Sequence, residues 1–315
     1  MMGGVLNVNK PQEMTSHDVV AILRRATGIK RIGHTGTLDP MATGVLPICI
    51  GSATRIMEYL DLDLKAYDCQ LQLGTMTDTL DIWGKTLETR SFAGVTEADI
   101  QEALTSFRGR IDQKPPMYSA VKVNGRKLYE YARAGQQVDV KSRPVYIKTL
   151  EQTGWDPARG VLSLTIVCTK GTYIRTICQD LGEKLGCGAV MTSLTRTASG
   201  ALDLDRAIDL ETLREMDPDA IARHLISPDL LLTAFGRGTV GEEAAWRLTA
   251  GQVLTARDWQ AEETPQYAQK EFYLPLREAL RRAYCMYGPD GQFLAVAFAE
   301  PGGRLKADKV FRSIE

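Results

Sequence analysis

The pattern of apolar and polar residues predicts four strands in this chain. Between residues 67 and 73 every second side chain is apolar and those between are polar, which predicts a half-buried strand with Tyr67 on its apolar face. The stretch 161–168 predicts a second strand. Short apolar runs at 5–8 and 45–50 predict two further strands, the latter buried.

Apolar residues at helical spacing predict helices, and residues suited to helix starts mark where these begin. The expected starts are Thr15 or Ser16, Ser52, Thr96, and the turn Lys170-Gly171. The first helix is expected to end near Gly28. The last buries an apolar stripe from Ile174 to Leu185, with Arg175 beside that stripe.

The order of these elements favours an α+β fold. Strands and helices mix without a regular βαβ repeat, and no period of 20 to 50 residues is visible. Pro228 and the glycines of 236–241 predict a boundary, so we expect one domain over 1–235 and a smaller one over 236–315. The turn 288–291 lies between two apolar runs and predicts a hairpin, so the smaller domain is expected to be β-rich.

Composition narrows the class of protein. At roughly 150 residues per domain, 315 residues correspond to about two domains. Apolar runs are far shorter than the roughly 18 residues of a membrane span, so no membrane association is expected. The N-terminus has no signal-peptide pattern, and the cytoplasm is the expected location. The six cysteines form no C-x-x-C pair, so we expect buried apolar thiols and no zinc site.

A net charge of −1 conceals a strongly basic segment. Residues 108–148 hold ten basic and three acidic side chains, with four tyrosines interleaved. Cations that neutralise phosphates beside rings that stack on bases are typical of nucleic-acid binding. An ordinary solvated surface is an equally weighted interpretation of the charge alone.

The segment Gly33-His34-Thr35-Gly36-Thr37-Leu38-Asp39-Pro40-Met41-Ala42-Thr43-Gly44 carries the clearest candidate chemistry. It contains neither a P-loop nor a dinucleotide fingerprint, which excludes both nucleotide-loop interpretations. Its glycines allow the backbone to bend, and Pro40 restricts the residues before it, so Asp39 is presented in a defined turn. An isolated Asp-Pro turn is more often without chemistry.

This loop resembles the catalytic loop of the TruB family of pseudouridine synthases. The resemblance continues in family order through further motifs over residues 3 to about 200: Lys10-Pro11 with Thr15-Ser16, Tyr67 to Gly74, Thr77 to Asp81, Gln113 to Ala120 and Lys170 to Arg175. The chain departs from the family pattern at Glu13, where glycine is usual, and at Thr195, where a second arginine is usual. We expect the first departure to alter a turn and the second to weaken a phosphate contact.

The resemblance implies isomerisation of a uridine to pseudouridine without a metal or organic cofactor. Asp39 would be the nucleophile or base, which requires its ionised form, and Arg175 would pair with it and favour that charge. Tyr67 would stack on the uracil and could take the C5 proton. The sequence leaves open whether Asp39 attacks C1′, adds to C6 or abstracts the C2′ proton.

The family substrate is uridine 55 in the T loop of tRNA, which must be turned out of its stack before reaction. By resemblance, His34 helps to hold the loop open, Leu194 closes the pocket, and Lys170 and Tyr173 contact the substrate. The segment 114–143 corresponds to a thumb-like insertion that grips the stem-loop, with basic residues at Lys122, Arg126 and Lys127. The stretch Gly291 to Phe311 resembles, more weakly, the end of a PUA-type RNA-binding domain.

Three other interpretations are open. A noncatalytic RNA-binding or RNA-folding protein could share this architecture, although intact Asp39, Tyr67 and Arg175 argue against it. An aspartate-nucleophile phosphotransferase would need a second acidic residue and Mg²⁺. An RNA-guided synthase would work with partner proteins, and the lack of lysine-rich tails favours a stand-alone enzyme. We therefore expect a monomer without an obligatory protein partner.

Overall fold

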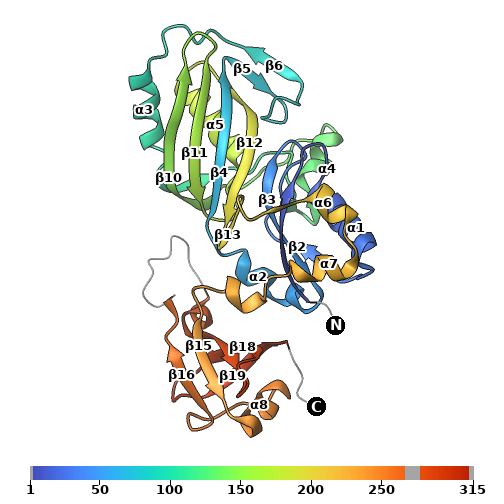
Figure 1. Cartoon of the computed structure of the whole chain (residues 1–315). Coiled ribbons are helices and arrows are strands. Elements are labelled where there is room, and N and C mark those ends of the chain that lie inside the picture. Colours follow the sequence, from blue (N-terminus) through green and yellow to red (C-terminus); the bar gives the residue numbers. More distant parts are fainter. Residues whose placement is uncertain (1–2, 267–276, 312–315) are drawn as a thin grey trace.

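The computed structural model describes residues 3–266 and 277–311. Within them a large mixed sheet flanked by helices is joined to a smaller β-rich part (Figure 1), so the predicted α+β class is confirmed. Residues 1–2, 267–276 and 312–315 of the two expected domains lie outside the described residues. Among the described helices, none is long and apolar enough to cross a membrane.

The large sheet has ten strands in the described part of the chain. Its order is β14-β1-β3-β12-β4-β11-β10-β7, with β2 beside β3 and β13 beside β12. The strands are β1 (Gly4–Lys10), β2 (Ile32–His34), β3 (Thr43–Ile50), β4 (Lys65–Leu73), β7 (Gly109–Gln113), β10 (Arg143–Asp156), β11 (Val161–Cys168), β12 (Ala189–Ser199), β13 (Leu202–Asp203) and β14 (Ile208–Asp209). Neighbours are antiparallel, except that β1 meets β14 and β3 meets β12 in parallel. The four strands predicted from the hydrophobic pattern are confirmed as β1, β3, β4 and β11.

Seven helices accompany these strands among the described residues. They are α1 (Ser16–Thr27), α2 (Met57–Leu60), α3 (Glu97–Thr105), α4 (Leu128–Arg133), α5 (Ile174–Lys184), α6 (Leu210–Glu215) and α7 (Pro218–Arg223). Thr15 and Thr96 each cap a helix by accepting from the backbone amide three residues on, and Gly28 ends α1 with a φ of 70°. These predicted starts and the predicted end of α1 are confirmed, as is the start of α5 after the Lys170-Gly171 turn.

The predicted cap at Ser52 is wrong. Residues Gly51–Ile56 form a 3₁₀ helix whose N-cap is Ile50, and no side chain caps it. Gly51 takes a φ of 61° directly after β3, so the chain is already turning before Ser52 is reached. Ser52 therefore lies inside the first turn instead of preceding it.

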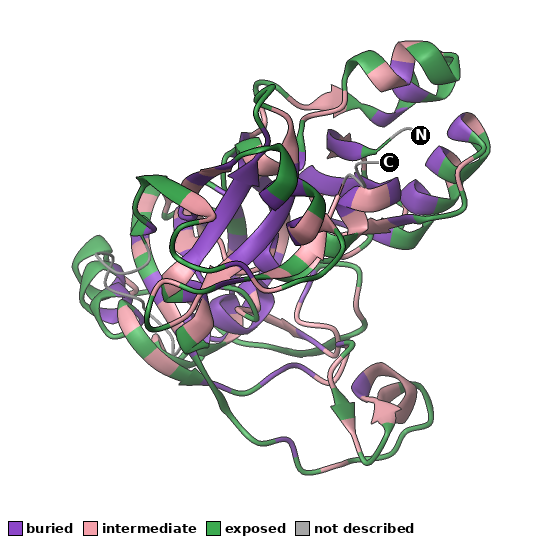
Figure 2. Ribbon diagram, turned by 90° about the horizontal axis from the view of Figure 1, so that it is seen from below, coloured by how far each residue is buried: buried purple, intermediate pink, exposed green. Residues whose placement is uncertain are grey.

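The interior of the large sheet is apolar and continuous. Figure 2 shows buried residues concentrated on its central strands and exposed residues on the outer loops. The α5 stripe packs into this core through Ile174, Ile177 and Leu181. All six cysteines are free and buried, as predicted.

The C-terminal part forms a five-stranded sheet in the order β16-β15-β17-β18-β19 within the described residues. Its elements are β15 (Gly236–Val240), α8 (Glu242–Thr249), β16 (Trp259–Glu263), β17 (Ala283–Tyr287), β18 (Phe293–Ala299) and β19 (Leu305–Val310). The hairpin predicted around residues 288–291 is confirmed by the antiparallel pair β17 and β18. Two short hairpins project from the large sheet: β5 (Thr75–Thr77) with β6 (Thr86–Thr89), and β8 (Lys122–Val123) with β9 (Arg126–Lys127).

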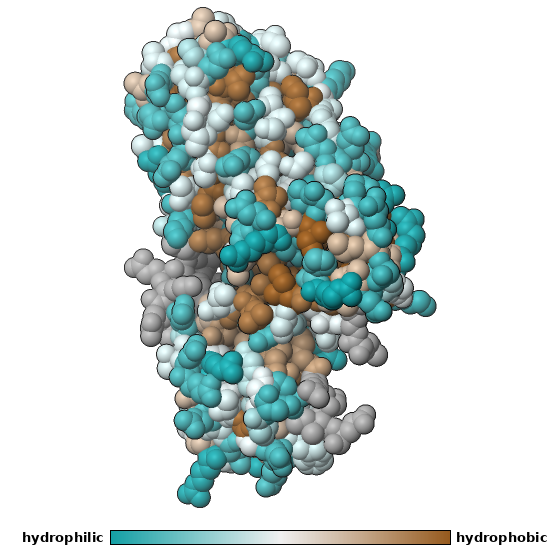
Figure 3. Space-filling view, in the orientation of Figure 1, coloured by the Kyte–Doolittle hydropathy of each residue, from teal (hydrophilic) through white to brown (hydrophobic). Residues whose placement is uncertain are grey.

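An apolar cluster and ion pairs join the two parts. Tyr59 and Phe235 belong to one buried cluster with residues of β1, β3, β17 and β18, and their rings meet edge to face at 5.2 Å. Figure 3 shows apolar side chains gathered on the visible face where the two parts meet. Glu58 accepts from Arg277 at 2.6 Å and from Lys309 at 2.9 Å, so the C-terminal part is anchored to α2.

Candidate active site

The loop between β2 and β3 carries Asp39, and its backbone is held at several points. The Ser16 hydroxyl accepts from the Leu38 amide at 2.9 Å and donates to the Leu38 carbonyl at 3.1 Å, which ties the loop to the start of α1. Gly44 has a φ of 99°, and a Cβ there would lie 2.2 Å from the Arg196 carbonyl oxygen. Only glycine fits at that point, so Asp39 is presented by a braced loop.

The two departures from the family pattern both lie beside this loop. Glu13 has a φ of 67°, in the left-handed region that favours glycine, and its amide donates to the Pro40 carbonyl at 2.9 Å. The turn is therefore formed by a residue less suited to it than glycine. Thr195 places its hydroxyl 2.9 Å from that of Thr43 across the β12–β3 contact.

Asp39 and Arg175 form an ion pair. Arg175, in the first turn of α5 and only 5% exposed, places its Nε 2.9 Å from the Asp39 carboxylate. Its other nitrogens donate to the carbonyls of Thr79 at 2.7 Å and Tyr118 at 2.9 Å. The guanidinium is therefore fixed by the backbone before it meets the carboxylate, which gives a rigid pair.

The electrostatics of Asp39 are set by opposing effects. Enclosure in the cleft raises the pKa of Asp39, the Arg175 charge acts against that increase, and the Asp81 charge adds to it. Because 37% of the Asp39 side chain remains exposed, we expect water to limit the increase.

Asp81 completes this arrangement and was not among the predicted site residues. One of its carboxylate oxygens lies 3.6 Å from Arg175, and the other accepts from the Thr79 hydroxyl at 2.8 Å and the Trp83 amide at 3.1 Å. The segment Thr77 to Asp81 was part of the family resemblance, but nothing in its local pattern indicated that its last residue would meet α5.

Tyr67 lies on the buried face of β4, as its alternation predicted, and is 7% exposed. Burial raises the pKa of Tyr67 to about 12, while the neighbouring Arg196 charge acts in the opposite direction. Arg196 is its direct partner across the β4–β12 ladder. The phenol is therefore neutral near pH 7, and its ring is available for stacking.

Arg196 is a second residue that the prediction missed. It is completely buried, and its Nε donates to the Val45 carbonyl at 2.6 Å. Both of its terminal nitrogens have no hydrogen-bond partner among the described residues. The sequence did hold a signal for this residue. Arg196 lies two positions after Leu194, so in a strand its charged side chain is on the same face as that apolar residue.

Three predicted substrate contacts lie around the same cleft. Leu194 is 8% exposed on β12, and Tyr173 precedes α5 with its peptide held by Gln113 at 2.8 and 3.0 Å. Lys170 is half-exposed and lies 3.8 Å from the Asp61 carboxylate. Only the family resemblance had predicted that these three residues belong to one site.

His34, the fourth predicted substrate contact, lies at the end of β2. Its Nδ1 is buried without a hydrogen-bond partner among the described residues, and its ring meets that of His17 edge to face at 5.4 Å. Burial and the charges of His17 and Arg196 lower the pKa of His34 to about 4. The imidazole is therefore neutral near pH 7.

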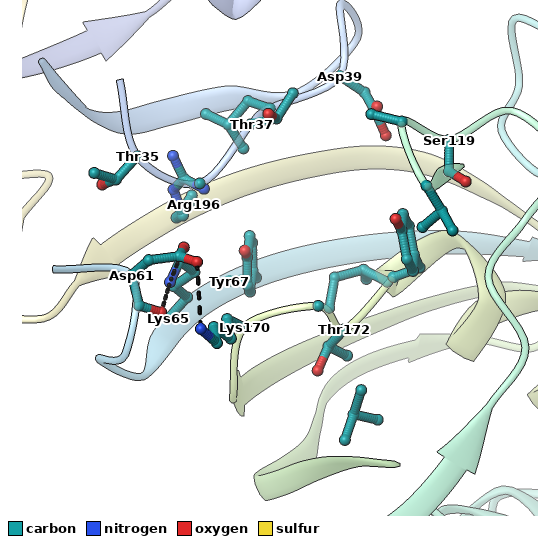
Figure 4. A pocket seen from close by; sticks show the side chains of 18 of the residues that line it. Thr35, Thr37, Asp39, Asp61, Lys65, Tyr67, Ser119, Lys170, Thr172 and Arg196 are labelled. Carbon is teal, nitrogen blue, oxygen red and sulfur yellow. Dashed lines mark hydrogen bonds and ion pairs between the residues drawn. The ribbon is translucent and has the colours of Figure 1, made fainter. Parts of the chain in front are cut away.

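The structure brings seven of the ten predicted site residues into one cleft of about 730 Å³ (Figure 4). They are His34, Asp39, Tyr67, Lys170, Tyr173, Arg175 and Leu194. Asp39, Tyr67 and Lys170 are labelled in Figure 4. The three predicted RNA contacts, Lys122, Arg126 and Lys127, lie outside this lining, whereas Val121 and Arg143 of the same segment take part in it.

That basic segment forms the hairpin β8–β9 followed by α4. Arg126 is held within the chain, since it donates to Gln136 and to the Glu130 carbonyl, both at 3.0 Å, and stacks over Tyr131 at 4.7 Å. Lys127 lies 5.4 Å from the ring centre of Tyr129, and Lys122 is exposed. Of the three predicted RNA contacts, Lys122 is the one that extends most freely into solvent.

The fold is that of pseudouridylate synthases, and two family models match successive parts of the chain. Residues 24–174 match the family described as TruB family pseudouridylate synthase (N terminal domain), and residues 175–233 match tRNA pseudouridylate synthase B C-terminal domain. The chain belongs to the TruB family of pseudouridylate synthases.

Relatives match along most of the chain. The protein named tRNA pseudouridine synthase B of Clostridium perfringens is 39% identical over 309 residues, covering 98% of this chain and 99% of its own. Its namesake in Heliobacterium modesticaldum is 42% identical over 282 residues, covering 89% and 91%. The namesake in Symbiobacterium thermophilum is 45% identical over 255 residues, covering 81% and 84%.

Solved structures share the fold at lower identity. The crystal structure of the archaeal box H/ACA sRNP Nop10-Cbf5 complex aligns with a TM-score of 0.71 and 21% identity, over 99% of this chain and 86% of the other. At that identity the match describes the arrangement of the sheet and helices and no more.

Proposed function

We propose that the chain isomerises uridine 55 in the T loop of tRNA to pseudouridine, with Asp39 as the catalytic nucleophile or base. The observation that carries this proposal is the Asp39 carboxylate held 2.9 Å from Arg175 in a cleft that also contains Tyr67. The shared name of the relatives, tRNA pseudouridine synthase B, supports tRNA as the substrate.

The reaction moves the ribose C1′ from N1 to C5 of the same uracil and is balanced without a co-reactant. Asp39 starts it by attack on C1′, addition to C6 or removal of the C2′ proton, and each route uses the same ionised carboxylate. Arg175 keeps that carboxylate oriented and favours its charge. No metal or organic cofactor is required by these steps.

The neutral Tyr67 ring is assigned to stacking on the uracil. Once C5 is bonded to the ribose, loss of the C5 proton restores the aromatic ring, and Tyr67 is assigned as the base that takes this proton, acting as its phenolate. His34, Leu194, Lys170 and Tyr173 enclose the nucleotide after it has been turned out of the RNA.

RNA binding is assigned to the segment 114–143 and to the C-terminal part. Lys122, Arg126 and Lys127 would contact phosphates of the stem, which position an RNA without reading its sequence. We assign residues 1–235 to the catalytic domain and 236–315 to a PUA-like RNA-binding domain, acting as a monomer without an obligatory protein partner.

The test is tritium release from an unmodified tRNA transcript that carries 5-³H-uridine, in the absence of Mg²⁺. We expect release from a transcript with uridine 55 and none from a matched transcript with cytidine at that position. Tight binding without any release would favour the noncatalytic RNA-binding alternative. Equal release from both transcripts would show that another uridine is the target.

A further inference from the structure

Arg196 is a buried cation whose partner is missing from the chain itself. Its side chain is completely buried on β12, where Nε donates to the Val45 carbonyl and the guanidinium lies close to the Tyr67 phenol. Nη1 and Nη2 have no hydrogen-bond partner, and no carboxylate lies within 4 Å of them among the described residues. A buried charge left unpaired is costly, so the arrangement is expected to be completed by a ligand.

The surroundings of Arg196 suit an oxygen that accepts hydrogen bonds. The Thr35 hydroxyl and the Nδ1 of the neutral His34 ring are also buried without hydrogen-bond partners among the described residues. At Gly36, whose φ is +64°, a Cβ would lie 3.0 Å from Arg196 Nη1. A glycine at this point keeps the guanidinium clear of side-chain atoms from the catalytic loop.

Other cations at this end of the cleft already have a counter-ion. Lys65 and Lys170 lie 3.6 and 3.8 Å from the two oxygens of the Asp61 carboxylate. Arg143 also lines the cleft but is exposed to solvent, so Arg196 is the buried cation that has no carboxylate partner among the described residues of the lining.

The position of Arg196 indicates which part of a nucleotide it meets. It faces Tyr67 directly across the β4–β12 ladder, and Figure 4 shows Arg196 and Asp39 on different sides of the Tyr67 ring. A ribose held at Asp39 would extend its base over Tyr67 toward Arg196. A phosphate is continuous with the rest of the RNA on both sides and must remain near the cleft mouth, whereas a base is the end of a branch and can be enclosed.

We propose that the Nη groups of Arg196 donate hydrogen bonds to a carbonyl oxygen of the flipped-out uracil and stabilise the charge it acquires in the reaction. This inference rests on the proposed function. When the C1′–N1 bond breaks, its electron pair stays on the uracil ring and is shared with O2 and O4. C5 then bonds to C1′, the C5 proton leaves to a base, and N1 is protonated.

The same contact selects uracil over cytosine. A guanidinium has only donors, so it fits the O4 oxygen of uracil and repels the amino group that cytosine carries at that position. Arg196 would therefore act both in base recognition and in catalysis.

The test separates the chemical step from RNA binding. Single-turnover pseudouridine formation at saturating tRNA transcript, the Kd of that transcript and its salt dependence are measured for wild type, Arg196→Met and Arg196→Lys. Arg24→Met is the matched control, because Arg24 also donates to a backbone carbonyl, that of Ile32 at 3.0 Å, but lies outside both the cleft lining and the basic segment 108–148.

We expect Arg196→Met to lower the single-turnover rate by about 10²- to 10³-fold, as loss of a donor to a developing oxyanion does. Its Kd should stay within about threefold of wild type with an unchanged salt slope, since the phosphate contacts are retained. Its melting temperature should not fall, because an unpaired buried charge has been removed. Arg196→Lys should be intermediate in rate, and Arg24→Met should match wild type.

Other results would overturn the assignment. A rate for Arg196→Met within about threefold of wild type would exclude the catalytic contact. A loss confined to Kd with a shallower salt slope would identify a phosphate contact, and a large fall in melting temperature would identify a structural brace. If the wild-type protein is active and any of these results is found for Arg196→Met, this inference alone is overturned. If the wild-type protein is inactive, the proposed function is overturned and this inference with it.

Discussion

Replacement of Asp39 by asparagine separates catalysis from folding and binding most directly. The change removes one charge and preserves shape, and the new amide oxygen can still accept from Arg175 Nε. If Asp39 is the nucleophile or base, we expect turnover to fall by a factor on the order of 10⁴ or more.

The effect on stability should be small for reasons visible in the structure. The pair spans 2.9 Å, but 37% of the Asp39 side chain is exposed, and pairs screened by water are worth about 0–1 kcal/mol. Arg175 keeps its bonds to the Thr79 and Tyr118 carbonyls and its Asp81 neighbour. A change of about 1 kcal/mol would move the melting temperature by only about 2–4 °C in a protein of this size.

Three measurements check this prediction: tritium release for turnover, filter binding for tRNA affinity, and circular dichroism for melting. Asp68→Asn is the matched control, because Asp68 lies on the exposed face of β4 and bonds Thr165 at 2.8 Å. It should retain activity. Unfolding of Asp39→Asn in parallel with its loss of activity, or turnover near that of wild type, would refute the assigned role of Asp39.

Further predictions concern pH, RNA binding and the loop. Because the pKa of Asp39 is raised, the single-turnover rate should begin to fall, as the pH is lowered, at a pH above the ordinary aspartate pKa of 3.8. A rate that falls only at or below pH 3.8 would contradict ionised Asp39 as the reacting group. Because the pKa of Asp39 is higher in the folded protein than in the unfolded chain, protonated Asp39 contributes its full stability below the unfolded pKa. That contribution is lost as the pH rises through the folded pKa. The stability of Asp39→Asn relative to wild type should therefore increase in melts at increasing pH. Charge reversal of the three basic residues of segment 114–143 should weaken tRNA binding and reduce the salt slope by about 0.7–0.9 per lost phosphate contact, most of it from Lys122; an unchanged slope would place the grip elsewhere. Ser16→Ala removes both bonds to the Leu38 peptide and should cost about 1–3 kcal/mol in denaturant unfolding with a lower turnover number, whereas unchanged unfolding and turnover would show that the loop needs no anchor there.

Much of the local structure could be predicted from the sequence because its causes are local. Period-two alternation predicted β4 with Tyr67 on the buried face, and Thr15, Gly28 and Thr96 marked helix ends through bonds to backbone groups a few residues away. Ser52 was misplaced because the tight turn at Gly51 changed where the chain begins to coil. The glycines and proline of the loop with Asp39 predicted a defined turn, and the family resemblance indicated that this turn is catalytic.

Tertiary structure alone decided which residues meet in the cleft. Asp39 reaches Arg175, and Tyr67 faces Arg196, through the register of strands and the packing of α5, and no local pattern encodes those distances. The family resemblance had anticipated the first pair. The charge of Arg196 could be read from the sequence, but its isolation from any acidic partner could not, because burial and pairing depend on every element that packs around β12.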